Sequence, residues 1–148
     1  MGIYNPRLTE VVAQSARELG YKKGLFFNGS GLDEISVSKR TKVTELDGET
    51  ITTYMLDDAV TGVGYGKQIY LGAKSKKESA AIILDVLSGK SDSLIGQTQR
   101  NVVLLNAAAG FYVSEKKQSF RSCVELAKGS IDSGKALQKL NNLKGYLV

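Results

Sequence analysis

Histidine is absent from the 148-residue sequence, and cysteine occurs once, as Cys123. Without histidine the chain lacks the commonest general base and transition-metal ligand, so a zinc site and a Ser-His-Asp or Cys-His catalytic set are excluded within it. A single cysteine excludes an internal disulfide framework and fits a reducing cytoplasm; we expect Cys123 to be a small apolar residue inside a helix. The remaining chemistry uses carboxylates, lysines, hydroxyls and backbone, which favours hard metal ions or simple binding.

Long hydrophobic runs are lacking as well. The apolar runs extend for only a few residues, as at residues 80–84, so no segment could span a bilayer and no membrane partner is expected. The first residues also lack the basic-then-apolar layout of a signal peptide. Together these absences predict a cytoplasmic protein.

The composition is otherwise that of a soluble globular protein, with 42% apolar and 24% charged residues. Its length suits one domain, and neither a repeat nor a long linker divides residues 1–148. The net charge of +5 comes from 20 Lys and Arg against 15 Asp and Glu. Since the basic residues form no long block and no aromatic residues interleave with them, the pattern favours solvated surface over a nucleic-acid site.

The order of the first elements is typical of an α/β domain. A helix is predicted from Asn5, a good N-cap residue, to Gly20, and residues 24–27 then form a short buried strand. Residues 35–55 alternate between apolar and polar positions on either side of an Asp-Gly turn at 47–48, which predicts a β-hairpin.

The rest of the chain is expected to be helical. A glycine-rich loop at residues 57–72, with at most one helical turn, and a polar connection at 91–99 separate predicted helices at about 75–89, 101–113, 119–134 and 137–143. A short buried strand usually has parallel neighbours on both sides, and the sequence supplies no obvious second one. We therefore predict an α/β fold with a partial sheet, few strands plus a hairpin, packed by about five helices. Its open sheet edge could join copies of the chain into a homo-oligomer.

The best candidate site is the acidic pair Asp33 and Glu34, which follows the buried strand in the loop NGSGLDE at residues 28–34. Ligands usually bind beyond the carboxyl ends of strands in α/β sheets, and glycines let backbone approach them closely. Two carboxylates with no nitrogen or sulfur ligand nearby suit Mg²⁺, with a solvated acidic turn as the alternative. The glycines at 62–66 lack the strand and helix of a phosphate loop, and Asp57-Asp58 is interpreted as a helix cap.

Several motifs in order resemble the C-terminal part of anthranilate phosphoribosyltransferases. They are GIY at residues 2–4, GLDEIS at 31–36, TKVTEL at 41–46, AAIILDVLSGK at 80–90, VLLNAAA at 103–109 and SIDSGKAL at 130–137. The resemblance covers essentially the whole chain. It implies the C-terminal portion of a nucleoside phosphorylase- or phosphoribosyltransferase-like α/β domain of a glycosyl transferase family.

The resemblance also implies a function. The family joins anthranilate to phosphoribosyl pyrophosphate in tryptophan biosynthesis, with Mg²⁺ as cofactor. The acidic pair of its signature binds the metal, which assigns that role to Asp33 and Glu34, and the resemblance implies substrate-binding positions at Asn28 and Gly29. Asn28 stands where many members have a histidine, which alters a polar contact at the substrate mouth.

The family's diphosphate-binding Gly-Thr-Gly-Gly-Asp loop, its anthranilate-contacting arginine and its N-terminal helical domain lie upstream of the part represented here. We therefore expect the chain to be inactive alone and to need that N-terminal half, from the same protein or a separate chain, as its partner. The alternative is a non-catalytic module of the same fold that binds nucleic acid or phosphate through the basic surface. The acidic pair is the feature that discriminates, because carboxylates do not help a phosphate-backbone binder.

Overall fold

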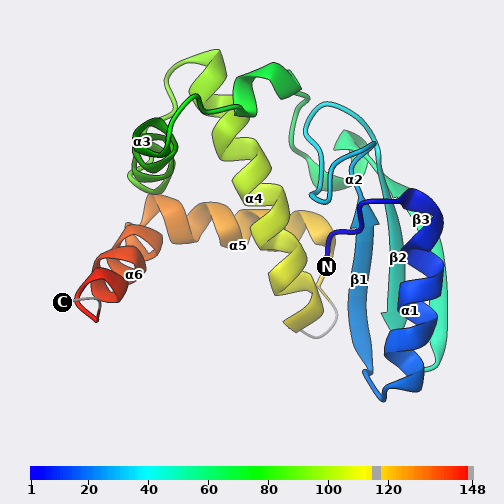
Figure 1. Ribbon diagram of the computed structural model, residues 1–148. Helices are drawn as coiled ribbons and strands as arrows, with labels where there is room; N and C mark the ends of the chain where they lie inside the picture. Colours follow the sequence, from blue (N-terminus) through cyan, green and yellow to red (C-terminus); the bar gives the residue numbers. More distant parts are fainter. Residues whose placement is uncertain (115–117, 147–148) are drawn as a thin grey trace.

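The computed structural model describes residues 1–114 and 118–146, and it has the α/β architecture predicted from the sequence (Figure 1). Strands β1 (Lys23–Asn28), β2 (Thr41–Asp47) and β3 (Thr50–Leu56) form an antiparallel sheet in the order β1-β2-β3. The predicted hairpin joins β2 to β3, and Gly48 adopts a positive φ of 61° in its turn.

Helix α1 (Thr9–Glu18) covers one face of this sheet (Figure 1). It is preceded by the 3₁₀ turn η1 (Pro6–Leu8), in which the Asn5 side chain accepts a hydrogen bond from the Arg7 N–H, as the N-cap prediction required. The fully buried Ala13 packs with Phe26 of β1 and Leu46 of β2 in a small core on this side.

The main core lies on the opposite face, under helices α4 (Leu94–Ser114) and α5 (Phe120–Asp132). Because side chains alternate along a strand, Leu25 and Phe27 of β1 point to this side while Phe26 points to α1. Cys123 of α5 is fully buried there, as expected. Strand β1 is therefore buried on both faces, which explains its apolar sequence.

Two further helices flank this layer on the side away from the sheet (Figure 1). Helix α3 (Lys76–Leu87) is capped by Ser75, whose side chain accepts from the Glu78 N–H at 3.1 Å. Helix α6 (Lys135–Lys144) is the predicted tail helix. In the part of the chain that the structure describes, no helix is long and apolar enough to cross a membrane.

The structure corrects several predicted boundaries. Helix α4 begins at Leu94, not near residue 101, because the Ser93 side chain caps the Gly96 N–H and Thr98 bonds to the Leu94 carbonyl within the helix. Residues 57–72 hold two short helical turns instead of at most one, α2 (Asp58–Thr61) and the 3₁₀ turn η2 (Gln68–Leu71). A side-chain amide on α4 holds η2, since Gln99 donates to the Tyr70 carbonyl at 3.0 Å.

One expectation about the strands changes and another is confirmed. Ile35 and Val37 are buried but lie in a loop, because the backbone of residues 35–36 bonds to the side chains of Asn106 and Thr41 and not to a strand. The described residues supply no parallel strand beside β1, as the sequence indicated: β2 pairs with it antiparallel, and at its other edge Gly2 forms a single parallel bridge with Phe27.

A shared carboxylate ties the hairpin to α4. The hydroxyls of Tyr54 and Tyr112 both donate to Glu45 Oε2, at 3.1 and 3.4 Å. Burial, and then the negative charge of Glu45, raise the pKa of Tyr112 to about 12 and raise the pKa of Tyr54 further. Ionising either tyrosine would place a second negative charge beside Glu45.

This arrangement predicts a loss of stability in alkali. The pKa of each tyrosine is raised on folding, so the stability is fully present below the unfolded pKa of about 10 and falls as the pH rises from there. In urea unfolding between pH 8 and 11.5, the free energy of unfolding should fall less steeply for the Tyr54→Phe/Tyr112→Phe variant than for the parent. Tyr146→Phe, which alters a tyrosine that is 85% exposed, should keep the parent slope. Equal slopes for all three proteins would contradict the assignment.

Candidate functional site

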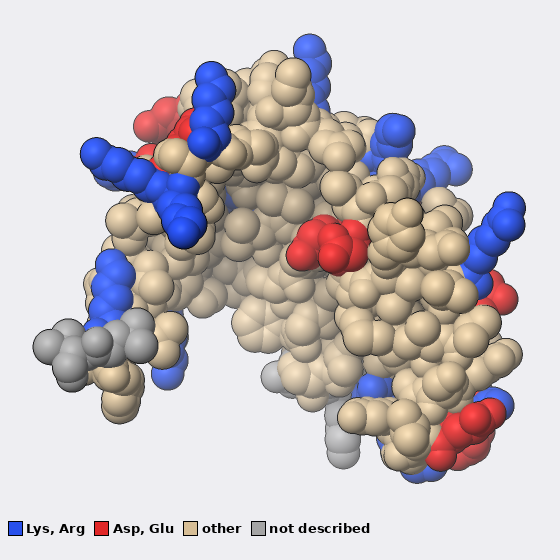
Figure 2. Space-filling model, viewed as in Figure 1, with Lys and Arg blue, Asp and Glu red and all other residues tan. Residues whose placement is uncertain are grey.

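The acidic pair lies where the sequence predicted, in the loop directly after β1. The side chains of Asp33 and Glu34 are both exposed, and within residues 1–114 and 118–146 neither forms a hydrogen bond or salt bridge. Burial lowers the pKa of the Met1 ammonium, and the nearby charge of Glu34 partly offsets that effect. Figure 2 shows an acidic group set apart from the basic side chains, at the edge of a hollow between the sheet and the helices.

Glycines bring the backbone of this loop close to its neighbours. A Cβ on Gly2 would lie 1.6 Å from the Asp33 carbonyl oxygen, and a Cβ on Gly29 would lie 2.2 Å from that of Glu34. No side chain fits in either place. The loop also turns through two positive φ angles, 57° at Ser30 and 101° at Gly31. Close backbone packing therefore fixes the backbone positions from which the side chains of Asp33 and Glu34 extend.

The Asn28 side chain fastens the start of the loop. Its Nδ2 donates to the carbonyls of Ile3 (2.8 Å) and Tyr4 (2.9 Å), and its Oδ1 accepts from the Gly31 N–H at 3.1 Å. The residue is only 2% exposed, so these bonds replace water at a buried amide. The hypothesis that Asn28 and Gly29 contact substrate stays a prediction. The geometry gives both residues a part in holding the acidic pair.

The far end of the loop is held from α4. Asn106 Oδ1 accepts from the Ile35 N–H at 2.9 Å, and its Nδ2 donates to the carbonyls of Ile35 (3.1 Å) and Val102 (2.9 Å). No role for Asn106 was predicted from the sequence. The available signal was an asparagine within an apolar helical stretch, where that residue is unfavourable unless its side chain has a partner.

The glycine-rich stretch at residues 62–66 does not form a second site. The Gly66 N–H donates to the Val37 carbonyl at 2.7 Å, and a Cβ on Gly66 would lie 2.4 Å from Thr98. Upstream, the Asp57 side chain caps α2 by accepting from the Val60 N–H, as predicted. These residues pack against the chain, and the acidic pair remains the candidate for chemistry.

The donors at the acidic pair fit Mg²⁺. Among the described residues no group of three or more His, Cys, Asp or Glu could enclose a metal ion. Two exposed carboxylates on one fixed loop leave most coordination positions to water and to a ligand's phosphates, which is the usual arrangement for this ion. Zinc sites usually need histidine or cysteine ligands, and neither stands beside this pair in the sequence.

Comparison with known proteins identifies the family. A family model described as "Glycosyl transferase family, a/b domain" matches residues 1–137, so the chain belongs to that family. The anthranilate phosphoribosyltransferase of Alkaliphilus metalliredigens is 35% identical over 97% of the chain, and that of Methanococcus vannielii is 39% identical over 97%. The chain spans 41% and 43% of these two relatives, respectively.

Solved structures agree with the family assignment. The Saccharomyces cerevisiae anthranilate phosphoribosyltransferase in complex with PRPP and Mg superposes with a TM-score of 0.82 at 27% identity, over 95% of this chain and 40% of that one. The enzyme from Thermus thermophilus gives 0.81 at 27% identity, over the same shares. The resemblance seen in the sequence motifs, to the C-terminal part of these transferases, is confirmed.

The buried amide of Asn28 can be tested by reversing its donors. In Asn28→Asp, carboxylate oxygens would face the carbonyls of Ile3 and Tyr4, so the free energy of unfolding should fall by about 3 kcal/mol or more. Asn142→Asp makes the same change on the exposed side of α6 and should cost under about 0.5 kcal/mol. Similar losses for both variants in urea unfolding would show that Asn28 has no special role.

The glycines of the loop provide a second test. Gly29→Ala should displace the loop at Glu34 and weaken Mg²⁺ binding measured by calorimetry, because its Cβ has no space. Gly31→Ala also places alanine in this loop, at a positive φ but with nothing within 4 Å, so it should cost only about 1 kcal/mol and leave the carboxylates in place. Equal effects on Mg²⁺ affinity would contradict the packing argument.

Proposed function

We propose that the chain acts as the C-terminal part of an anthranilate phosphoribosyltransferase and supplies the carboxylates that hold its Mg²⁺. The reaction transfers the phosphoribosyl group from phosphoribosyl pyrophosphate to anthranilate, in the cytoplasm and in tryptophan biosynthesis. The observation that carries the proposal is the acidic pair Asp33 and Glu34, exposed on a tightly packed loop at the end of a buried strand. A related yeast enzyme that binds PRPP and Mg supports it.

In this function the chain's own residues position charge. Asp33 and Glu34 would hold the ion, and when bound the ion neutralises the negative charge that develops on the departing pyrophosphate. Asn28 and Asn106 hold the two ends of the loop, so the carboxylates need little rearrangement before they bind. Preorganisation of this kind is a large part of catalysis in transfers between charged groups.

The proposal requires a partner. No residue of this sequence matches the family's diphosphate loop or its anthranilate-contacting arginine. The polypeptide that carries those residues must therefore bind beside Asp33 and Glu34 to complete the site. The chain alone should therefore be nearly inactive. Its substrates, phosphoribosyl pyrophosphate and anthranilate, would bind between the two parts.

The nucleic-acid-binding alternative draws less support. The basic side chains on the face drawn in Figure 2 lie around its periphery and form no continuous track across it. A protein that follows a phosphate backbone needs such a track, and its affinity falls steeply with salt. Salt-dependent binding to DNA or RNA, with no response to Mg²⁺ at the acidic pair, would favour the alternative.

The test is complementation. This chain, mixed with the portion of a family member that precedes the matched region, should consume anthranilate when phosphoribosyl pyrophosphate and Mg²⁺ are present, measured as loss of anthranilate fluorescence. The Asp33→Asn/Glu34→Gln variant should lower the rate by roughly 100-fold, which corresponds to about 2.7 kcal/mol of lost transition-state stabilisation.

The control for this experiment is Glu18→Gln/Asp92→Asn. It removes the same two charges from exposed positions on other elements and should leave the rate unchanged. A stable complex of this chain with the preceding portion that shows no activity would contradict the catalytic proposal. Equal rates for the two double variants would contradict it as well.

A further inference from the structure

Asn28 and Gly29 form the only Asn-Gly pair of the sequence. Asparagine is a thermally labile residue, and it reacts most readily before glycine, which leaves the next backbone nitrogen unshielded. In this reaction the Gly29 nitrogen loses its proton to water and attacks Cγ of Asn28, which closes a cyclic succinimide. The amide nitrogen leaves as ammonia after taking a proton from water. Water then opens the ring at either carbonyl, giving aspartate, or isoaspartate with the main chain running through the side chain.

The acidic loop (residues 28–34) requires this reactive pair. The Asn28 amide both donates to two backbone carbonyls and accepts from the Gly31 N–H, which a carboxylate cannot do. At the next position, a Cβ would lie 2.2 Å from the Glu34 carbonyl oxygen, so only glycine fits. Neither residue can change without disturbing the loop that carries the acidic pair.

The closed loop blocks each step of ring closure. The Gly29 N–H donates to the Leu32 carbonyl at 2.8 Å, so its nitrogen is not free to lose the proton and attack. Three hydrogen bonds hold the Asn28 side chain, and the residue is 2% exposed. Asn28 also pairs with Lys42 as the last residue of β1, and ring closure needs a backbone turn that a paired strand residue does not have.

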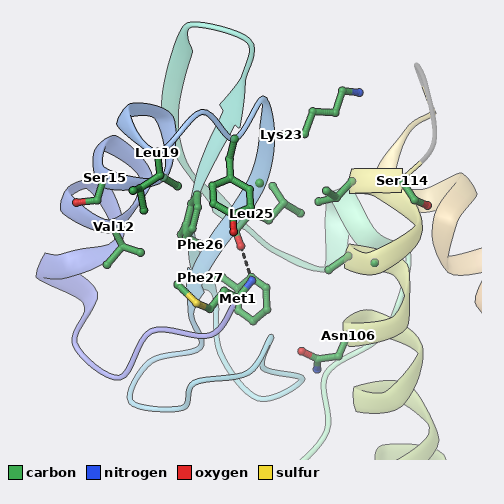
Figure 3. Close-up of a pocket in the computed structure, with 16 residues that line it drawn as sticks. Met1, Val12, Ser15, Leu19, Lys23, Leu25, Phe26, Phe27, Asn106 and Ser114 are labelled. Atoms are coloured by element: carbon green, nitrogen blue, oxygen red, sulfur yellow. Dashed lines mark hydrogen bonds between the residues drawn. The ribbon is translucent and has the colours of Figure 1, made fainter.

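The far end of the loop is held less firmly than the start. Asn106 bonds to the N–H and carbonyl of Ile35, but its side chain is only half-buried. It lines a cavity of about 740 Å³ between α1, β1 and α4, and Figure 3 shows it directed from α4 towards the side on which Met1 lies. Water in the cavity can compete for these bonds, whereas the Asn28 bonds are buried. Because local opening costs less than global unfolding, the loop should open from the Asn106 end.

We propose that Asn28-Gly29 is a deamidation site that the closed acidic loop suppresses, that opening of the loop releases, and that then keeps the loop open. Both products carry a carboxylate whose charge faces the carbonyls of Ile3 and Tyr4. Isoaspartate also adds a methylene to the main chain between β1 and the loop. Since the ammonia is lost, the change is one-way. It marks chains whose loop has opened and removes them from the population that holds the acidic pair in place.

The test follows isoaspartate and aspartate at residue 28 by peptide mapping and mass spectrometry, during incubation of the whole chain at mildly alkaline pH. The folded chain should react slower than the urea-unfolded chain by roughly 100-fold or more. Asn106→Ala frees the far end of the loop and should raise the rate in the folded chain by roughly 10-fold. Gln99→Ala is the matched control, because it removes another bond from an α4 side-chain amide to a backbone carbonyl, that of Tyr70. It should leave the rate unchanged.

A milder variant keeps the test sound if Asn106→Ala does not fold. Asn106→Asp retains an acceptor for the Ile35 N–H and loses the donors to the carbonyls of Ile35 and Val102, so it should raise the rate by a smaller factor. In the deamidated chain the Gly31 amide, which donates to Asn28 Oδ1, should exchange its hydrogen faster than in the parent.

Three results would overturn the proposal. Equal deamidation rates in the folded and unfolded chains would show that the loop gives no protection. Equal rates for the Asn106 and Gln99 variants would assign the reaction to global unfolding. Parent-like exchange at Gly31 after deamidation would show that the loop closes again. None of these readouts involves Mg²⁺ or anthranilate, so the deamidation proposal and the catalytic proposal can fail independently.

Discussion

The buried amide of Asn28 is the interaction on which the geometry of this protein depends most directly. With three hydrogen bonds it joins the end of β1 to the carbonyls of Ile3 and Tyr4 and to the turn at Gly31. Each of those backbone groups would cost free energy if it were buried without a partner. Gly2, next to Ile3, packs against the Asp33 carbonyl. One side chain thus sets both the parallel path of residues 1–3 and the start of the acidic loop.

A second constraint joins the sheet to the helices. The side chain of Asn106 on α4 hydrogen-bonds to both the N–H and the carbonyl of Ile35, 71 residues away in the sequence. The Tyr112 hydroxyl of the same helix donates to Glu45 on β2. Leu25, Phe27 and Val43 share one apolar core with buried residues of α4 and α5. Packing alone is non-directional, so these polar contacts add the geometric specificity that places the acidic loop against α4.

The sequence predicted the features that depend on neighbouring residues. The caps at Asn5 and Asp57 and the Asp-Gly hairpin act through bonds within a few positions, and all of them form as expected. The place of Asp33 and Glu34 also followed from a local rule, because a loop after a buried strand opens at the sheet's end.

The features that the sequence did not predict depend on distant partners. The alternation at Ile35 and Val37 looks like a strand, but Asn106 and Thr41 take the backbone bonds that a strand would have used. The helical turn η2 is held by Gln99 of α4, far along the chain. The holding role of Asn28 likewise became visible only when residues 3–4 lay beside β1.

The strand order has a consequence for how the molecule assembles. The strands pair in the order in which they occur in the chain, so the sheet with α1 forms through contacts of short sequence separation. Docking of α4 must close much longer loops, and such contacts generally form later in folding. The loop with Asp33 and Glu34 lies at the junction and gains the support of Asn106 only at that step. In that order of folding the acidic pair would reach its final geometry last, and a partly folded chain would carry the two carboxylates without the support of Asn106.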